Sequence, residues 1–302
     1  MHLMRAASHY GWDNLIPPAV TVGSGDELTL DLIESSGGQI TRSAVHFDVS
    51  TFDLDRVNPV TGPIAVAGAQ PGDALAVSIL DLDVDDWGWS ANIPGFGLLA
   101  DQFPHAYLAL SQIDEAGIHL PFGVRLDRVP MIGTIGVAPP EPGLHPILPP
   151  RRWGGNLDVR HITRGSRILL PVGVDGAMLS IGDAHGAMGD GEVCGTGVET
   201  GARVRIRVEV VPGRVLTAPR YTTDPSSDRV GPAVATTGVG PDLMRASVDA
   251  ASAMIDEIVH RTGLSPVEAY VLASLAGDLK ISEIVDGPNW VVSMHMPLKV
   301  LE

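Results

Sequence analysis

Ionisable side chains gather most densely in residues 180–194, which read SIGDAHGAMGDGEVC. Asp183 and His185 are two residues apart, so on a β-strand both side chains would project from the same face. Asp190 and Glu192 have the same spacing. If the segments on either side of the glycine-rich middle pair as a hairpin, three carboxylates and one imidazole converge. Such acceptors repel one another unless a cation or shared protons offset the charge, so the pattern indicates a metal site.

Nitrogen and oxygen ligands together are typical of catalytic Zn²⁺ sites that keep an open coordination position. Fe and Mn accept the same ligands, and a structural Ca²⁺ would use oxygen ligands alone. We therefore expect a divalent metal, with zinc as the first choice and Ca, Fe and Mn as alternatives. The competing interpretation is a plain turn, because Gly-Asp and Asp-Gly pairs are common at turns and this chain uses Gly-Asp at other predicted turns.

Three other places hold groups that could serve a site. Residues 154–158 read GGNLD, where the glycines would let the backbone approach a ligand; an Asx turn is the alternative. His9 belongs to the unusual grouping SHYGWDN. Cys194, the only cysteine, is a candidate nucleophile that would need a nearby base such as His185. A lone cysteine is more often a small buried hydrophobe, and the residues around Cys194 favour a strand.

Short β-strands must position these groups, because most of the first 230 residues read as apolar runs between Gly/Pro turns. Residues 20–33 form two such runs around GSGD, a hairpin-like pattern, and residues 63–82 repeat it. The clearest strand is 202–211 (ARVRIRVEVV), whose alternating apolar and charged residues are typical of an antiparallel sheet with one wet face. Residues 137–153 contain six prolines and are predicted to be a loop.

The pattern changes to helices near residue 240. A stretch opened by Gly240-Pro241-Asp242 has apolar residues at helical spacing and ends at Gly263, and Ser265 then caps a second helix. Two closing strands follow, at 279–285 and 290–296. We therefore predict a mainly β fold, α+β overall, with a β-rich core over 1–239 that includes the metal loop 180–194. Residues 240–302 are predicted to form a helical hairpin and closing strands that pack on this core without being independent of it.

Composition excludes several functional classes. The chain has 302 residues, 36 acidic against 20 basic, and a formal net charge of −16, which repels nucleic-acid backbones. No apolar run approaches the roughly 20 residues needed to span a bilayer, and the first residues lack the apolar segment of a signal peptide. One cysteine excludes an internal disulfide framework and a Cys-rich zinc site. We expect a cytoplasmic protein with no nucleic-acid or membrane partner.

A set of ordered blocks resembles the acetamidase/formamidase family along nearly the whole chain. The GDxHxxxGDGE stretch is the most specific of them. The matching blocks are HYGWDNLIPPAVTVGSGDELTLD, SGGQI, RVNPVTGPIAVAGAQPGDALAVSILD, PGFGLL, GGNLD, LPVGVDGAMLSIGDAHGAMGDGEVCGTGVE and GDLKISEIVD. The resemblance implies a jelly-roll-like β-sandwich with an additional small β portion, and a metal-dependent hydrolase that cleaves the C–N bond of small linear amides to ammonia and a carboxylate. It also implies a homo-oligomer, a dimer or higher.

The same resemblance assigns roles to residues. Asp183 and His185 would be metal ligands, and Glu192 or Asp190 would be a ligand or the general base. The GGNLD block would place Asp158 at the metal and Asn156 at the substrate, and His9 would be an additional substrate-binding group.

The metal would lower the pKa of a bound water and polarise the substrate carbonyl. Substrate choice is less defined, because the loops HPILPPRRW and DDWGWS do not match the family pattern. Two rival functions remain: hydrolysis of an ester, lactone or cyclic amide on the same metal site, and a non-catalytic β-sandwich module that holds a structural Ca²⁺.

Overall fold

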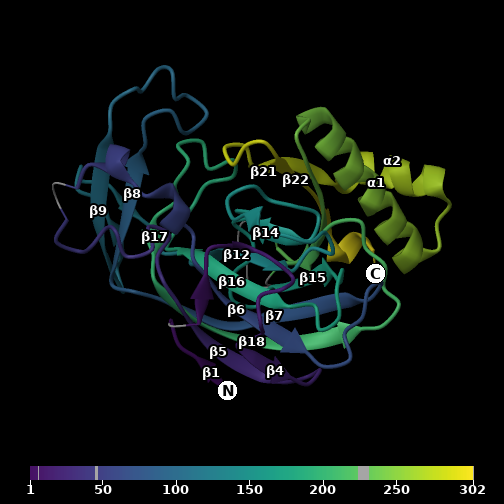
Figure 1. Ribbon diagram of the computed structural model, residues 1–302. Helices are drawn as coiled ribbons and strands as arrows, with labels where there is room; N and C mark the ends of the chain where they lie inside the picture. The colour runs from purple at the N-terminus through teal and green to yellow at the C-terminus, as the bar shows by residue number, and fades with distance from the viewer. Residues whose placement is uncertain (6, 45–46, 224–230, 302) are drawn as a thin grey trace.

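The computed structural model describes residues 1–5, 7–44, 47–223 and 231–301, and within them the chain is mainly β (Figure 1). One sheet has nine strands, and all its pairings are antiparallel except β1 with β5. Its strands in spatial order are β1 (His2–Leu3), β5 (Glu27–Leu32), β18 (Ala202–Val211), β7 (Ala74–Val84), β15 (Arg167–Pro171), β19 (Arg220–Thr222), β20 (Ala233–Gly240), β22 (Trp290–Pro297) and β21 (Asp278–Glu283).

A second sheet of eleven strands covers the first. Its main path is β11 (Arg125–Leu126), β10 (Gly117–His119), β9 (Tyr107–Asp114), β8 (Trp87–Asn92), β17 (Glu199–Thr200), β16 (Leu179–His185), β12 (Met131–Val137) and β14 (Gly154–Asn156). Strand β6 (Val60–Val66) joins β16 from the side and pairs with β2 (Ser8–His9) and β4 (Val20–Val22). A two-stranded ribbon, β3 (Gly11–Trp12) with β13 (His145–Pro146), stands apart.

The main core lies between the two large sheets, which confirms the predicted sandwich of a mainly β fold. Leu30 of β5 and Val204 of β18 are fully buried from one sheet, and Ile64 of β6, Ile135 of β12 and Ile181 of β16 are fully buried from the other. The predicted strand 202–211 is β18, and its burial alternates as expected: apolar residues face the core while arginines face solvent. Apolar burial on both inner faces is the main favourable term that holds the sheets together.

The two predicted hairpins are wrong. Strand β4 pairs in parallel with β6, whereas β5 pairs with β1 and β18 in the other sheet; β6 and β7 are likewise in different sheets. The turn chemistry itself is as expected, since the Asp26 carboxylate accepts the Gly23 N–H at 2.7 Å. Each turn carries the chain from one sheet to the other. The two flanking strands can bury their apolar faces in opposite sheets as well as they can side by side in one sheet.

The helical hairpin is confirmed. Helix α1 (Leu243–Thr262) begins after the N-cap Asp242, whose side chain accepts the Arg245 N–H, and ends at Gly263 in the left-handed conformation. Helix α2 (Pro266–Ala276) begins at the Ser265 capping box. Both cover one end of the nine-stranded sheet (Figure 1), where α1 packs on β20 and β22 through a second apolar cluster. Strands β20, β21 and β22 pair together, and the division at residue 240 stays a prediction.

A buried carboxylate ties α1 to the sheet. Glu257 is 5 % exposed and accepts hydrogen bonds from Arg214 at 2.8 Å, Arg220 at 2.6 Å and Arg261 at 2.8 Å. Burial alone would raise the pKa of Glu257. The guanidinium groups of Arg261 and Arg220 nevertheless hold this pKa below its usual value.

We expect Glu257→Ala to lower the free energy of unfolding by about 3–5 kcal/mol, because removing one partner leaves buried charges uncompensated. Denaturant unfolding measures this. The control is Asp249→Ala, which removes an exposed pair with Arg245 and is expected to cost less than about 1 kcal/mol. Equal losses in the two variants would contradict the assignment.

Among the described residues, no helix combines the length and the apolarity that crossing a membrane requires.

Candidate metal centre and cavity

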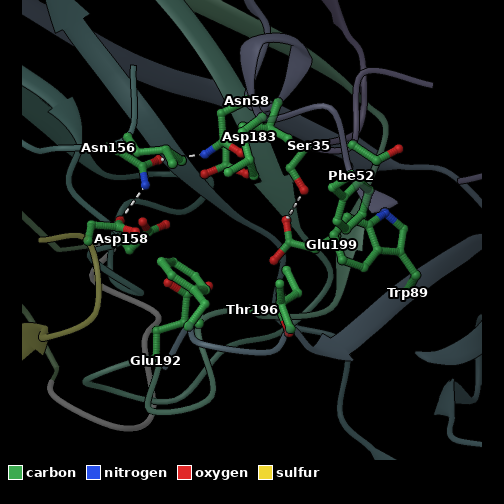
Figure 2. A pocket seen from close by; sticks show the side chains of 18 of the residues that line it. Ser35, Phe52, Asn58, Trp89, Asn156, Asp158, Asp183, Glu192, Thr196 and Glu199 are labelled. Carbon is green, nitrogen blue, oxygen red and sulfur yellow. Dashed lines mark hydrogen bonds between the residues drawn. The ribbon is translucent and has the colours of Figure 1, made fainter. Parts of the chain in front are cut away.

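Acidic side chains from distant parts of the sequence meet at one end of a cavity of about 250 Å³. Figure 2 shows this cavity with the side chains that line it. The ionisable residues on its lining are Asp158, Asp183, His185, Glu192, Glu199 and Asp286, and all are buried. A further buried carboxylate, Glu283, lies behind them. The structure therefore brings together four of the residues expected from sequence, Asp158, Asp183, His185 and Glu192, and adds three that the pattern did not single out.

Strand β16 positions Asp183 and His185 as their two-residue spacing predicts. The His185 Nε2 atom lies 3.3 Å from an Asp183 carboxylate oxygen and 3.1 Å from one of Glu199. Glu199 is directly opposite His185 on the neighbouring strand β17. Its carboxylate accepts hydrogen bonds from Ser35 and from the Gly197 N–H, both at 2.7 Å. A Cβ at Gly197 would lie 2.7 Å from His185 Nδ1, so a glycine is needed for the imidazole to occupy this position.

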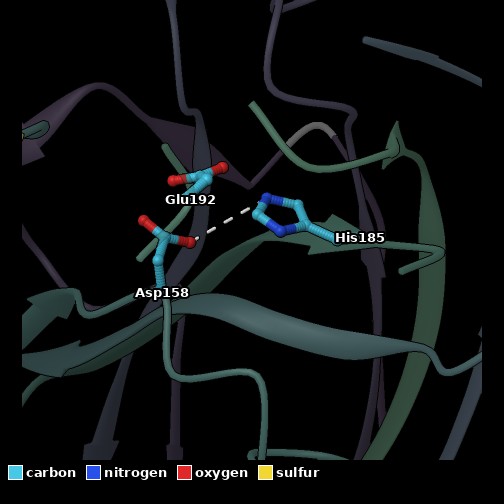
Figure 3. A group of neighbouring side chains, drawn as sticks. All are labelled: Asp158, His185 and Glu192. Atoms are coloured by element: carbon cyan, nitrogen blue, oxygen red, sulfur yellow. Dashed lines mark ion pairs between the residues drawn. The ribbon is translucent and has the colours of Figure 1, made fainter. Parts of the chain in front are cut away.

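Residues 180–194 do not fold as the expected hairpin. After β16 the chain leaves the sheet, and Gly191 pairs instead with Glu283 at the end of β21, where its N–H donates to the Ser282 carbonyl at 2.8 Å. This contact with a strand about ninety residues later is what brings Glu192 to the cavity. Figure 3 shows Glu192, Asp158 and His185 facing one another.

Strand β14 and the residues after it supply Asn156 and Asp158. The Asn156 side chain accepts a hydrogen bond from Asn58 at 3.1 Å and another from Thr134, and its amide donates to Asp286. Asp158 lies 3.9 Å from His185 Nε2. The GGNLD block therefore reaches the cavity as expected, through an extended segment paired with β12.

Four residues on the cavity lining have a strained backbone. Asn58, Asp158, Asp183 and Glu192 have φ values of 47°, 42°, 54° and 45°, in a region that residues with a side chain rarely adopt. Each such residue costs on the order of 1–3 kcal/mol and persists where its surroundings enforce it, most often at functional sites. The surrounding fold therefore holds the backbone of these residues in this conformation, which turns their side chains toward the cavity.

The remaining candidates lie elsewhere. The Asp190 carboxylate is 3.9 Å from His161, and Asp190 does not line the cavity. His9 contacts the Ser180 hydroxyl at 2.8 Å and the Gly11 carbonyl at 2.7 Å, and it is also absent from the cavity lining. Cys194 is exposed and outside any strand, so the expectation of a buried strand cysteine is wrong. Although the residue is exposed, its thiol is partly buried, 3.2 Å from the Ala91 carbonyl. This partial burial raises the pKa of the thiol, which opposes thiolate formation.

The electrostatics of the cluster favour a cation. Burial, together with the neighbouring carboxylates, raises the pKa values of Asp158, Glu192 and Asp286 well above their usual range. Burial also raises the pKa of Glu283, to about 7. Although burial alone would lower it, Glu199 and Asp183 raise the pKa of His185 well above its usual value. Without a cation, the protein must therefore hold protons in this cluster near neutral pH.

The donor atoms fit a divalent metal. Two groups each place three ligand atoms within 4.8 Å of one another, Asp158–His185–Glu192 and Asp183–His185–Glu199. Asp158 Oδ1 is buried with no hydrogen-bond partner, and buried polar atoms are rarely left unsatisfied. One imidazole with several carboxylates suits Zn²⁺, Mn²⁺ or Fe²⁺, and the geometry does not select among them.

We expect the metal-free protein to lose stability as the pH rises from 5 to 8. A group whose pKa is raised in the folded state stabilises the fold fully below its pKa in the unfolded chain, which is near 4.5 for Glu283. This stabilisation is lost as the pH rises through the pKa of the folded state. Denaturant unfolding in a chelator at several pH values measures this slope.

The matched variant for this measurement is Asp286→Asn, which keeps an acceptor for Asn156 and removes one buried carboxyl. Its metal-free form is expected to show a shallower decline. A stability that rises with pH equally in both proteins would contradict the explanation.

Comparisons with known proteins show which family the chain resembles in sequence and in fold. A family model described as the Acetamidase/Formamidase family matches residues 2–147 and 143–302. An acetamidase of Mycolicibacterium smegmatis is 33% identical over 282 residues, covering 72% of this chain and 69% of that protein. The crystal structure of an acetamidase from Bacillus halodurans superposes with a TM-score of 0.91 at 34% identity, covering 99% of this chain and 98% of that one. A gamma lactamase from Delftia acidovorans gives a TM-score of 0.69 at 27% identity, covering 97% and 89%.

Proposed function

The chain belongs to the acetamidase/formamidase family, and from that premise we propose that its acidic cluster holds a divalent cation and hydrolyses the C–N bond of a small linear amide. As a member of this family the chain is an amidohydrolase of linear amides; the metal dependence and the residue roles are our proposal. The observation that carries it is the convergence of Asp158, His185 and Glu192 on the lining of the cavity, with an unpartnered carboxylate oxygen on Asp158.

Asp158, Asp183 and His185 would hold the cation, with zinc as our first choice. When bound, a divalent cation makes a water molecule more acidic and polarises a carbonyl group. Glu199 lies 3.1 Å from the same Nε2 atom of His185 that Asp183 approaches at 3.3 Å, so it would be a further ligand. The Ser35 hydroxyl holds its carboxylate in place.

Glu192 is proposed as the general base and then the general acid. Its carboxylate would take a proton from the attacking water as oxygen bonds to the carbonyl carbon. It would return the proton to the nitrogen as the C–N bond breaks, giving ammonia and a carboxylate. Burial raises the pKa of Glu192, and an acid–base group works best with a pKa near the working pH. Asp190, the other candidate, points toward His161 instead.

Asn156 would orient the substrate. Its carbonyl oxygen is occupied by Asn58 and Thr134, and one hydrogen of its amide group is used by Asp286. A side-chain amide has two N–H donors, so a second one is free to bind a substrate oxygen. Three partners hold the Asn156 side chain in place, which suits a group that must meet a small substrate in one orientation.

A substrate panel tests the proposed reaction. Protein with measured metal content is incubated with acetamide, the matching ethyl ester and a γ-lactam, and the release of ammonia and of new carboxylate is followed separately. We expect ammonia and carboxylate in equal amounts from the amide and little product from the ester.

The γ-lactam arm is included because a solved gamma lactamase shares this fold at 27% identity. Ring opening that is faster than hydrolysis of every linear amide would favour the rival function. A non-catalytic Ca²⁺ module, the other rival, would use oxygen ligands alone, whereas the buried imidazole of His185 lies at the centre of this cluster.

A further inference from the structure

The cavity has an apolar end opposite its acidic end. Every ionisable side chain among the described residues that line it belongs to the acidic cluster. The lining also has apolar side chains. Those that pack in one cluster with Trp89 we call the aromatic wall: Phe52, Trp89 and Ile93. In Figure 2, Phe52 and Trp89 lie together on one side of Glu199, and Asp158 and Glu192 lie on the other.

Sheet register sets the distance between the two ends. His185 of β16 is directly opposite Glu199 of β17, and Glu199 is directly opposite Trp89 of β8. Residues opposite one another across antiparallel strands point to the same face. Neighbouring strands are about 4.8 Å apart, so the row from His185 to Trp89 spans about 10 Å along the cavity.

The aromatic wall is rigid before any ligand binds. The Trp89 indole donates to the buried Glu34 carboxylate at 2.7 Å, and its ring lies 5.8 Å from that of Phe52 at a 44° tilt. Both rings pack in one apolar cluster with Ile40 and Val49. The wall therefore presents a fixed apolar surface, and burying apolar substrate area against it is favourable without a cost for ordering the side chains.

The space is too large for an acyl group of one carbon. A volume of about 250 Å³ is close to the roughly 300 Å³ at which pockets for drug-sized ligands begin. A substrate whose carbonyl group sits at the acidic cluster and whose acyl group is only a methyl would leave the wall covered by water. Displacing poorly held water from an apolar surface by an apolar group gains affinity.

From the volume, the wall and the row of strands we infer that the preferred substrate of this chain is a primary amide with a bulky apolar acyl group, aromatic or branched, that reaches the aromatic wall. This inference rests on the proposed function and names its substrate class. The carboxamide lies at the acidic cluster, and the acyl group extends over Glu199 toward Trp89 and Phe52. The water attack, the cleavage of the C–N bond and the proton transfer are those given above.

A series of primary amides tests the inference. Initial rates of ammonia release are measured for acetamide, butyramide, hexanamide, benzamide and phenylacetamide, and kcat/KM is compared. We expect kcat/KM to rise about fourfold for each methylene buried, and to be at least about tenfold higher for phenylacetamide than for acetamide.

The outcomes separate the two proposals. Acetamide as the best substrate would overturn the substrate class while leaving the amidase function intact. Ammonia from none of the amides, with the metal site loaded, would instead overturn the proposed function.

Variants of the wall give a second readout. Phe52→Ala is expected to lower the ratio of kcat/KM for phenylacetamide over acetamide about tenfold. Ile93→Ala, in the apolar cluster that contains both rings, should lower the same ratio and serves if the first variant is poorly folded. The matched control is Phe122→Ala, which removes an equal ring at a position 59% exposed and outside this cavity. A ratio unchanged by both wall variants would contradict the inference.

Discussion

Treatment with a chelator of divalent cations is expected to abolish ammonia release from amides, and adding Zn²⁺ back is expected to restore it. The cavity holds several buried carboxylates around one imidazole, and without a cation these groups must bind protons to limit their repulsion. A bound divalent metal would make the attacking water more acidic at neutral pH. Metal content measured alongside the rate shows whether activity follows occupancy.

The genetic counterpart is His185→Ala, which removes the nitrogen ligand shared by both candidate metal groups. We expect activity to fall by more than about 100-fold, because even residues that only support a metal ligand are worth about 10–100-fold. The control is His260→Ala, at an exposed position in the last turn of α1. Full activity after verified loss of metal would contradict the proposal and point to a protein nucleophile.

Glu192→Gln is expected to lower kcat by about 10²–10⁴-fold, the usual contribution of general acid–base catalysis, while the protein keeps its metal. Glutamine has nearly the same shape but cannot accept and return a proton. The expected signature is a loss in kcat with unchanged metal stoichiometry and an unchanged melting curve with metal bound.

Asp190→Asn is the companion variant, because both carboxylates are in the same loop. Its effect should be much smaller, since Asp190 lies near His161 and outside the cavity lining. A larger effect at Asp190 than at Glu192 would reverse the assignment. Loss of metal in Glu192→Gln would make Glu192 a ligand and leave the base to be found among its neighbours.

Local signals in the sequence predicted some elements well. The alternation in residues 202–211 and the caps at Asp242 and Ser265 depend on neighbours within a few residues, and the structure has them as expected. Which strands pair with one another, in contrast, is not determined by residues nearby in the sequence. Turns such as residues 23–26 have the residues of a tight turn whether the next strand pairs beside the last or crosses to the opposite sheet, so the two hairpins were predicted wrongly.

The site residues also fall into those that have a local signal in the sequence and those that do not. Asp183 and His185 were predictable because two-residue spacing on a strand fixes a common face. Glu199 could have been found if the strand opposite His185 had been known, and Glu283 and Asp286 come from a strand that meets the loop only in the folded protein. The left-handed backbone at Asp158, Asp183 and Glu192 has no local sequence signal, since it is imposed by the surrounding fold.

The bridge between Gly191 and Glu283, and the hydrogen bond between Asn156 and Asp286, determine the order in which parts of the site form during synthesis. While the chain grows on a ribosome, Asp158, Asp183 and His185 are made before the segment that holds Glu192. That segment follows Gly191 by about ninety residues. The proposed acid–base group is therefore fixed in place only when strand β21 has joined the sheet, after the predicted metal ligands have been made.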